Sequence, residues 1–386
     1  MANASPLMNV HLLPLRLVAV LLGIFAVSVH AEDQPNPPAS PAAKPAEKPA
    51  AKPAAPPPKP PSESELRATI TKGLGFLAKD GEAWMAAKDC NGCHHLPEML
   101  WSHREAKLRG FDVDQAKFDE WLAWAEERSK DKKPGTEMMA LMKLALPDRP
   151  MPELTKLILE SQQPDGSWKP GGQFSGMQKR GAPDATASAT RLFLLALATP
   201  AEQTASPDAQ SAQPDAQPAR AESAASFETA RTKAAALLAK KDAPTSTESL
   251  VYRTLYARST GSTADADALR TEILKQQRGD GGWSSFIGEN MSDPLATGQV
   301  LWALQPNAAD PKIAEAIARA QLWLLKTQRD DGSWPIDITH ISKVDRSATA
   351  KAKSFKDATM IYTYFGSGWA TIGLLQSVPL KADVAK

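Results

Sequence analysis

Residues 276–283 read Gln-Gln-Arg-Gly-Asp-Gly-Gly-Trp, and this stretch decides the fold because the chain repeats it. Residues 162–168 read Gln-Gln-Pro-Asp-Gly-Ser-Trp, and residues 328–334 read Gln-Arg-Asp-Asp-Gly-Ser-Trp. Each copy ends one predicted helix and precedes another. Glycine permits the positive φ of a helix end, aspartate bonds the turn backbone, and tryptophan packs between neighbouring helices. The repeat therefore predicts a structural turn between paired helices.

The segments around these turns have the periodicity of amphipathic helices. Ser62 to Glu65 form a capping box, and apolar residues recur on one face from Leu66 to Leu77. Further helices are predicted near 98–109, 115–127, 136–146, 152–163, 184–198, 227–241, 247–259, 264–277, 294–304, 311–328 and 367–378. These helices form about six pairs, so the predicted fold class is all-α, with a repeat architecture.

The turn and the helix after it carry a family resemblance. The helices that follow the copies contain Ala185-Thr186, Ala296-Thr297 and Ala370-Thr371. Gln-x-x-Asp-Gly-x-Trp followed by such a helix resembles the QW repeat of squalene–hopene cyclases and prenyltransferases. The resemblance is clear over 150–378 and weaker over 62–149, where residues 75–84 are a degenerate copy. It implies an α/α toroid of outer and inner helices around a central cavity, here over residues 62–380.

The first residues predict export. Arg16 is the only charge ahead of an apolar run, Leu17 to Val29, and small residues at Val29 and Ala31 suit cleavage after Ala31. We therefore expect a signal peptide at 1–31 and a periplasmic or secreted protein that is not an integral membrane protein after cleavage. An uncleaved anchor is the alternative, although the run is shorter than the roughly 20 residues that span a bilayer.

Two segments are predicted to be disordered. Residues 32–61 are dominated by Pro, Ala and Lys and lack core-forming side chains, so they are expected to form a semi-rigid linker. Residues 199–226 are rich in Ala, Pro, Gln, Asp and Ser and are expected to be an insertion between helix pairs.

The chain has two cysteines, Cys90 and Cys93, and His94 follows directly. Cys-x-x-Cys-His is the pattern of c-type haem attachment. Two thiols one helical turn apart reach the two vinyl groups of one haem, and the adjacent imidazole binds the iron. This likeness to the cytochrome c motif predicts one covalent haem c at 90–94, with His94 as the metal ligand.

A disulfide and a zinc site are the alternatives for this motif. A thioredoxin-like pair belongs to a βαβ context, and zinc needs a second Cys or His pair. His95, next to His94, is predicted to be a surface residue. Candidate sixth ligands are Met138, Met139, Met177, Met291, His340 and Met360. An open sixth position is the other possibility.

The resemblance does not carry the cyclase chemistry with it. Class II terpene cyclases use an Asp-x-Asp-Asp motif, whereas the matching helix start here keeps only Asp184, which is expected to be an N-cap. Protein prenyltransferases need a zinc-binding cysteine, and both cysteines belong to the haem motif. Cyclase activity is therefore not expected.

Three functions follow from these features. The first is an exported c-type haem protein on a toroid, acting in redox chemistry with a partner protein. The second is a toroid enzyme that acts on a hydrophobic, isoprenoid-like substrate held in the cavity. The third is a binding or scaffolding repeat protein. The net charge of +1 argues against a nucleic-acid partner.

Overall fold

The computed structural model describes residues 58–88, 95–131, 136–170, 182–198, 216–240, 243–336 and 348–381. The predicted signal peptide lies outside these residues, as does the predicted linker apart from its last few positions. The described part belongs to one compact unit, Pro56–Lys386. None of its helices is long and apolar enough to cross a membrane.

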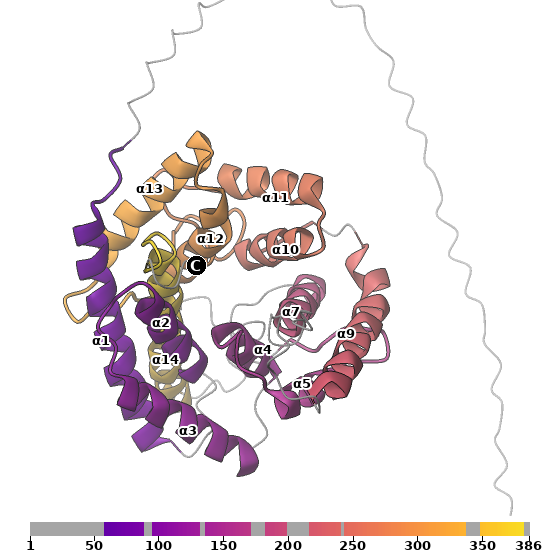
Figure 1. The fold of residues 1–386 in the computed structure, drawn as a ribbon. Coiled ribbons are helices and arrows are strands. Elements are labelled where there is room, and N and C mark those ends of the chain that lie inside the picture. The colour runs from indigo at the N-terminus through magenta and orange to yellow at the C-terminus, as the bar shows by residue number, and fades with distance from the viewer. Residues whose placement is uncertain are drawn as a thin grey trace, which may run out of the picture. The chain divides into compact units, whose positions relative to one another are not determined.

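Two concentric rings of helices make up this unit (Figure 1). The outer helices are α1 (Glu63–Ala87), α3 (Gln115–Asp131), α5 (Pro152–Glu160), α9 (Ala216–Leu238), α11 (Thr263–Lys275) and α13 (Pro311–Thr327). The inner helices are α2 (Leu96–Leu108), α4 (Thr136–Ala145), α7 (Ala182–Leu197), α10 (Thr247–Ser259), α12 (Pro294–Leu304) and α14 (Ala348–Leu375). Each inner helix contacts the next, and α14 contacts α2, so the inner ring is closed. The predicted α/α toroid of about six helix pairs is confirmed.

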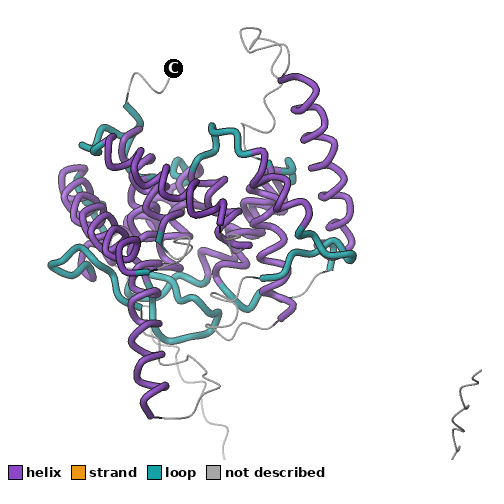
Figure 2. Tube along the Cα trace, turned by 90° about the horizontal axis from the view of Figure 1, so that it is seen from below, coloured by secondary structure: helices purple, strands orange, loops and turns teal. Residues whose placement is uncertain are grey.

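Helices and loops account for the described residues, which contain no strand (Figure 2). Two isolated β-bridges, Ser246 with Phe286 and Trp283 with Asp293, connect loops on the rim where outer helices pass into inner ones. The long loop before α12 therefore also holds the start of α10.

The three tryptophans of the repeat occupy equivalent positions. Trp168, Trp283 and Trp334 are each almost completely buried. The indole N–H of each donates to a carbonyl of the preceding outer helix, at Ile158, Ile273 and Leu324, over 2.8 to 2.9 Å. The backbone N–H of each donates to a hydroxyl of the following inner helix, at Thr190, Thr297 and Ser367. Each tryptophan thus joins the two helices of its own pair.

The glutamine six residues before each tryptophan joins one pair to the next. The side-chain amides of Gln162, Gln277 and Gln328 donate to carbonyls of the next outer helix, at Ala230, Ala316 and Thr69, over 2.8 to 2.9 Å. The same amides also donate to the turn glycines, at Gly166, Gly281 and Gly332. The bond from Gln328 to Thr69 joins α13 to α1 and closes the outer ring.

The turn glycines lie against the neighbouring backbone. Gly332 has φ +88°, and a Cβ there would lie 2.1 Å from the carbonyl oxygen of Lys72 in α1. Gly166 makes the same approach to Lys233 in α9. Only glycine combines the positive φ with this close approach.

Some predicted boundaries and registers are wrong. α9 begins at Ala216, so the insertion predicted at 199–226 ends earlier; its alanine-rich sequence favours helix. α14 begins at Ala348 rather than near 367, for the same reason. The degenerate copy at 75–84 forms no turn, because α1 stays helical through it. Of the three recurring Ala-Thr pairs, only Thr297 bonds a repeat tryptophan, because Trp168 donates to Thr190 and Trp334 to Ser367.

Replacing Gly332 by alanine should weaken ring closure. The left-handed conformation should cost about 1–2 kcal/mol in a residue with a Cβ. The collision with the backbone of Lys72 should add about 1–3 kcal/mol. Gly261→Ala is the matched control, since Gly261 has φ +75° but no atom within 4 Å of its added Cβ. Urea unfolding should show a larger loss for Gly332→Ala, and equal losses would contradict the proposed role of the contact.

Candidate functional site

The predicted haem-binding residues Cys90, Cys93 and His94 lie outside the described residues. The helices on either side fix their place in the chain, since α1 ends at Ala87 and α2 begins at Leu96. The motif therefore lies in an outer-to-inner connection, as do the three Gln–Trp turns.

His95, the first described residue after the motif, is buried with an exposed fraction of 1%. Its ring stacks on Trp84 at a centroid distance of 4.3 Å and packs against Tyr364 at 4.0 Å. Its Nε2 lies 3.4 Å from an Asp80 carboxylate oxygen, yet neither ring nitrogen makes a hydrogen bond. Burial lowers the pKa of His95, and Asp80 opposes this effect. The prediction of a surface histidine is wrong, because α1 and α14 enclose the ring between two aromatic side chains.

Glu98 lies one turn further along α2 and is also buried, with both carboxylate oxygens lacking a hydrogen-bond partner. Burial raises its pKa to about 8, so the carboxyl is largely protonated at neutral pH. Its side chain abuts Gly368 of α14, where an added Cβ would lie 2.8 Å from the Glu98 Cβ. Buried polar groups are nearly always hydrogen-bonded in folded proteins. The unpaired oxygens make Glu98 a candidate functional residue.

Tyr364 connects these groups. Its hydroxyl donates to the carbonyl of Leu77 over 3.0 Å. Burial raises its pKa well above the ordinary value, and the nearby charges of Glu98 and Asp80 add to the shift. We call Asp80, His95, Glu98 and Tyr364 the rim cluster. It combines a buried imidazole, a buried carboxyl and a carboxylate whose side chain is 34% exposed.

A hollow beside the rim cluster shares Asp80 with it and encloses about 380 Å³. It is lined by Phe76, Asp80, Arg329, Asp331, Ser333, Lys356, Thr359, Met360 and Thr363. Met360 precedes Tyr364 by one helical turn, and its side chain is 40% exposed. The hollow thus offers a thioether, a phenyl ring and two cationic side chains beside Asp80.

The other candidate sixth ligands lie in different surroundings. Met138 and Met139 are buried in α4, whereas Met291 is 52% exposed. Met177 and His340 lie outside the described residues. Within the described ranges, no three His, Cys, Asp or Glu side chains gather as a metal site would require.

Asp184 has a structural role that differs from the predicted N-cap. α7 begins at Ala182, so Asp184 lies inside the first turn. Its buried carboxylate accepts hydrogen bonds from the hydroxyls of Thr245 and Ser246, over 2.6 and 2.9 Å. It therefore ties α7 to the loop before α10. Asp293 does cap α12, and burial raises its pKa to about 6.

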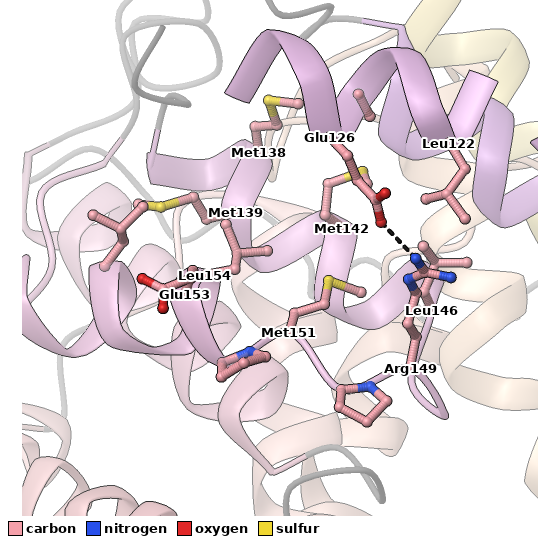
Figure 3. A pocket seen from close by; sticks show the side chains of 14 residues that line it. Leu122, Glu126, Met138, Met139, Met142, Leu146, Arg149, Met151, Glu153 and Leu154 are labelled. Atoms are coloured by element: carbon pink, nitrogen blue, oxygen red, sulfur yellow. Dashed lines mark hydrogen bonds and ion pairs between the residues drawn. The ribbon is translucent and has the colours of Figure 1, made fainter. Parts of the chain in front are cut away.

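A second hollow, on the outer side of the ring, is lined by four methionines (Figure 3). It encloses about 550 Å³ between α3, α4 and α5. Its residues are Leu122, Ala125, Glu126, Met138, Met139, Met142, Leu146, Arg149, Pro150, Met151, Pro152, Glu153, Leu154 and Leu157. We call it the methionine groove.

Comparison with known proteins supports the fold and contradicts the expected family. No family model and no curated protein matches the chain. A possible member of the GH105 family from Salmonella enterica serovar Paratyphi A matches with 12% identity and a TM-score of 0.50, over 82% of this chain and 94% of that one. A glycosidase variant in complex with glucose matches with 13% identity and a TM-score of 0.41, over 81% and 88% of the two chains.

The expected membership of the squalene cyclase and prenyltransferase family is therefore wrong, and the comparisons give no support to a cytochrome relationship. At such low identity, the likeness to the possible GH105 member establishes the toroid fold alone. The physical reason lies in the Gln–Trp turns, whose bonds build a toroid without placing any catalytic group. A structural turn motif does not identify a family.

Glu98→Gln should remove part of the pH dependence of stability. The folded-state pKa of about 8 lies above the ordinary 4.5, so the native state holds a proton that the unfolded state loses. This stabilisation is complete below about pH 4.5 and declines as the pH rises toward 8, by an amount on the order of a few kcal/mol. Urea unfolding between pH 5 and about pH 8 should show this decline in the wild type and a flatter profile in Glu98→Gln. The exposed Glu153→Gln is the matched control, and a profile unchanged by Glu98→Gln would show that Glu98 ionises freely.

Proposed function

We propose that this chain is an exported c-type haem protein in which a helical toroid presents one covalent haem on its rim for electron exchange with a partner protein. The observation that carries the proposal is Cys-x-x-Cys-His at residues 90–94, made from the only two cysteines of the chain. The motif falls between α1 and α2 in the sequence, directly before the buried His95 and four residues before Glu98, whose carboxylate oxygens make no hydrogen bond.

The surrounding residues suit such a group. Cys90 and Cys93 would hold the haem by thioether bonds, and His94 would ligate its iron. Phe76, with Arg329 and Lys356 in the same hollow, offers an apolar contact and cations for the two propionates. A bound haem supplies reversible one-electron exchange. His95, fixed between two aromatic rings, would restrain the peptide that carries His94.

Met360 is the sixth ligand that this arrangement favours. Its thioether is partly exposed in the hollow that borders the rim cluster, and it lies on the helix whose Tyr364 packs against His95. Met138 and Met139 instead line the methionine groove. A His–Met pair raises the potential of haem iron and suits electron transfer.

Protein made with an intact c-haem maturation system should be coloured, and it should remain coloured after denaturation because the haem is covalent. Its mass should exceed that of the polypeptide by one haem, and Cys90→Ala with Cys93→Ala should abolish the addition. A colourless exported protein with a Cys90–Cys93 disulfide would refute the proposal. In the haem-loaded protein, Met360→Ala should lower the reduction potential and change the absorption spectrum, whereas Met291→Ala should change neither.

A second candidate function is an enzyme that acts on a sugar chain. Glu98 favours it, since a buried carboxyl with a pKa of about 8 can donate a proton at neutral pH. Asp80, in the same rim cluster, is more exposed, and paired carboxyls in unlike environments suit acid and base roles. The likeness to a possible GH105 member is consistent with this class. The isoprenoid-like substrate was expected only from the resemblance to squalene cyclases, and that family membership is wrong.

The sugar-chain hypothesis predicts release of reducing ends from one member of a polysaccharide and oligouronide panel. Glu98→Gln should reduce the rate by about 100-fold or more, the usual contribution of a general acid. Asp310→Asn, at the cap of an outer helix, is the control that should retain activity. Equal rates in wild type and Glu98→Gln would eliminate Glu98 as the acid, and no release from any member of the panel would eliminate this function.

A further inference from the structure

The methionine groove lies where the outer ring lacks a Gln–Trp turn. Such turns follow α5, α11 and α13, but the connection after α3 contains neither the glutamine nor the tryptophan. We call a repeat stapled when its turn carries the Gln–Trp motif. In the stapled repeat after α5, Trp168 bonds both its outer helix and the following inner helix α7, and its ring stacks on Phe193. The groove lies between α3 and α4, the pair whose connection lacks the motif, and α5 forms its far wall.

The walls of this space are almost entirely apolar. Figure 3 shows Met138, Met139, Met142 and Met151 gathered around it together with Leu122 and Leu146. Its volume of about 550 Å³ falls within the roughly 300–1,000 Å³ typical of small-molecule sites. Thioethers adapt their shape to a ligand and make favourable contacts with aromatic rings. The space therefore suits a ring system larger than one indole.

Polar groups occur at the edge rather than inside. Glu126 and Arg149 form an ion pair at 2.5 Å, and both side chains are about half exposed. None of the residues that line the groove has a buried side-chain polar atom without a partner. A ligand would need no hydrogen bonds within the groove, and its polar end would meet the ion pair.

We propose that the methionine groove binds a lipophilic small molecule with a flat aromatic or conjugated ring body, which takes the place that tryptophan fills in the stapled repeats. The site is separate from the rim cluster and does not depend on the proposed haem. The bound ligand would contact both α3 and α5, where no turn glutamine bonds one outer helix to the next.

The test uses the full mature chain as isolated, with methionine methyl groups labelled with ¹³C, and N-phenyl-1-naphthylamine as the neutral aromatic probe. Methyl resonances assigned by single Met→Leu variants should shift for Met138, Met142 and Met151, while that of the core residue Met99 should not. Equilibrium dialysis should give one probe molecule per chain.

Filling the groove should compete with the probe. Met142→Trp should weaken binding by about tenfold or more, equivalent to about 1.4 kcal/mol, and should raise the melting temperature. Leu322→Trp, on the exposed surface of α13, is the matched control and should bind as the wild type does. If circular dichroism shows that Met142→Trp is unfolded, Leu154→Glu tests the same point, because it places a charge in the apolar wall from a half-buried position.

Three results would overturn the proposal. The first is no probe binding by the wild type. The second is binding that neither Met142→Trp nor Leu154→Glu weakens, or methyl shifts confined to residues outside the groove. The third is a wild-type dimer in sedimentation that excludes the probe and that Met142→Trp dissociates, since the groove would then be covered by a second copy.

Discussion

The hydrogen bond from a turn glutamine to the next outer helix is the interaction on which the ring depends. It joins three pairs of neighbouring outer helices, and other polar contacts, such as that of Tyr364 with Leu77, add to it. Gln328 spans 259 positions of sequence to reach Thr69, and this bond joins the last outer helix to the first. Gly332 permits it, because only a residue without a Cβ can lie against the backbone of Lys72. The inner ring is then held closed by the packing of α14 on α2 and α12.

The Gln–Trp turn also explains why the sequence predicted the helix pairs correctly but not the family. Trp168, Trp283 and Trp334 identify the helix pairs, since an indole buried between two helices requires one fixed spacing from the turn glycine. The family could not be predicted in this way. The turn uses its polar atoms to close a ring, and a ring of helices can surround any site. The resemblance was therefore sound for the architecture and wrong for the family.

Local sequence gave less information where tertiary contacts decide the outcome. The local sequence around His95 suggests an exposed side chain, but Trp84 and Tyr364 enclose its ring from two other helices. Asp184 has the form of an N-cap, yet hydroxyls from the α9–α10 loop bind its carboxylate. The methionine groove was not predicted either. The missing tryptophan was visible after α3, but whether neighbouring side chains would refill the space is a matter of packing.

The proposed haem site and the methionine groove both lie at outer-to-inner connections that lack the Gln–Trp motif. Connections with the Gln–Trp motif have their polar groups committed to neighbouring helices. The connection after α1 lacks it and carries Cys90, Cys93 and His94, while Trp121 of α3 donates to Glu82 and fills the space beside α1. The connection after α3 also lacks it, and there the space remains open as the methionine groove. The connection after α9 lacks the motif as well, but there the hydroxyls of Thr245 and Ser246 bind Asp184 of α7. The contacts among the inner helices keep the ring closed. The connections after α1 and α3 are where a covalent cofactor and a lipophilic ligand are proposed.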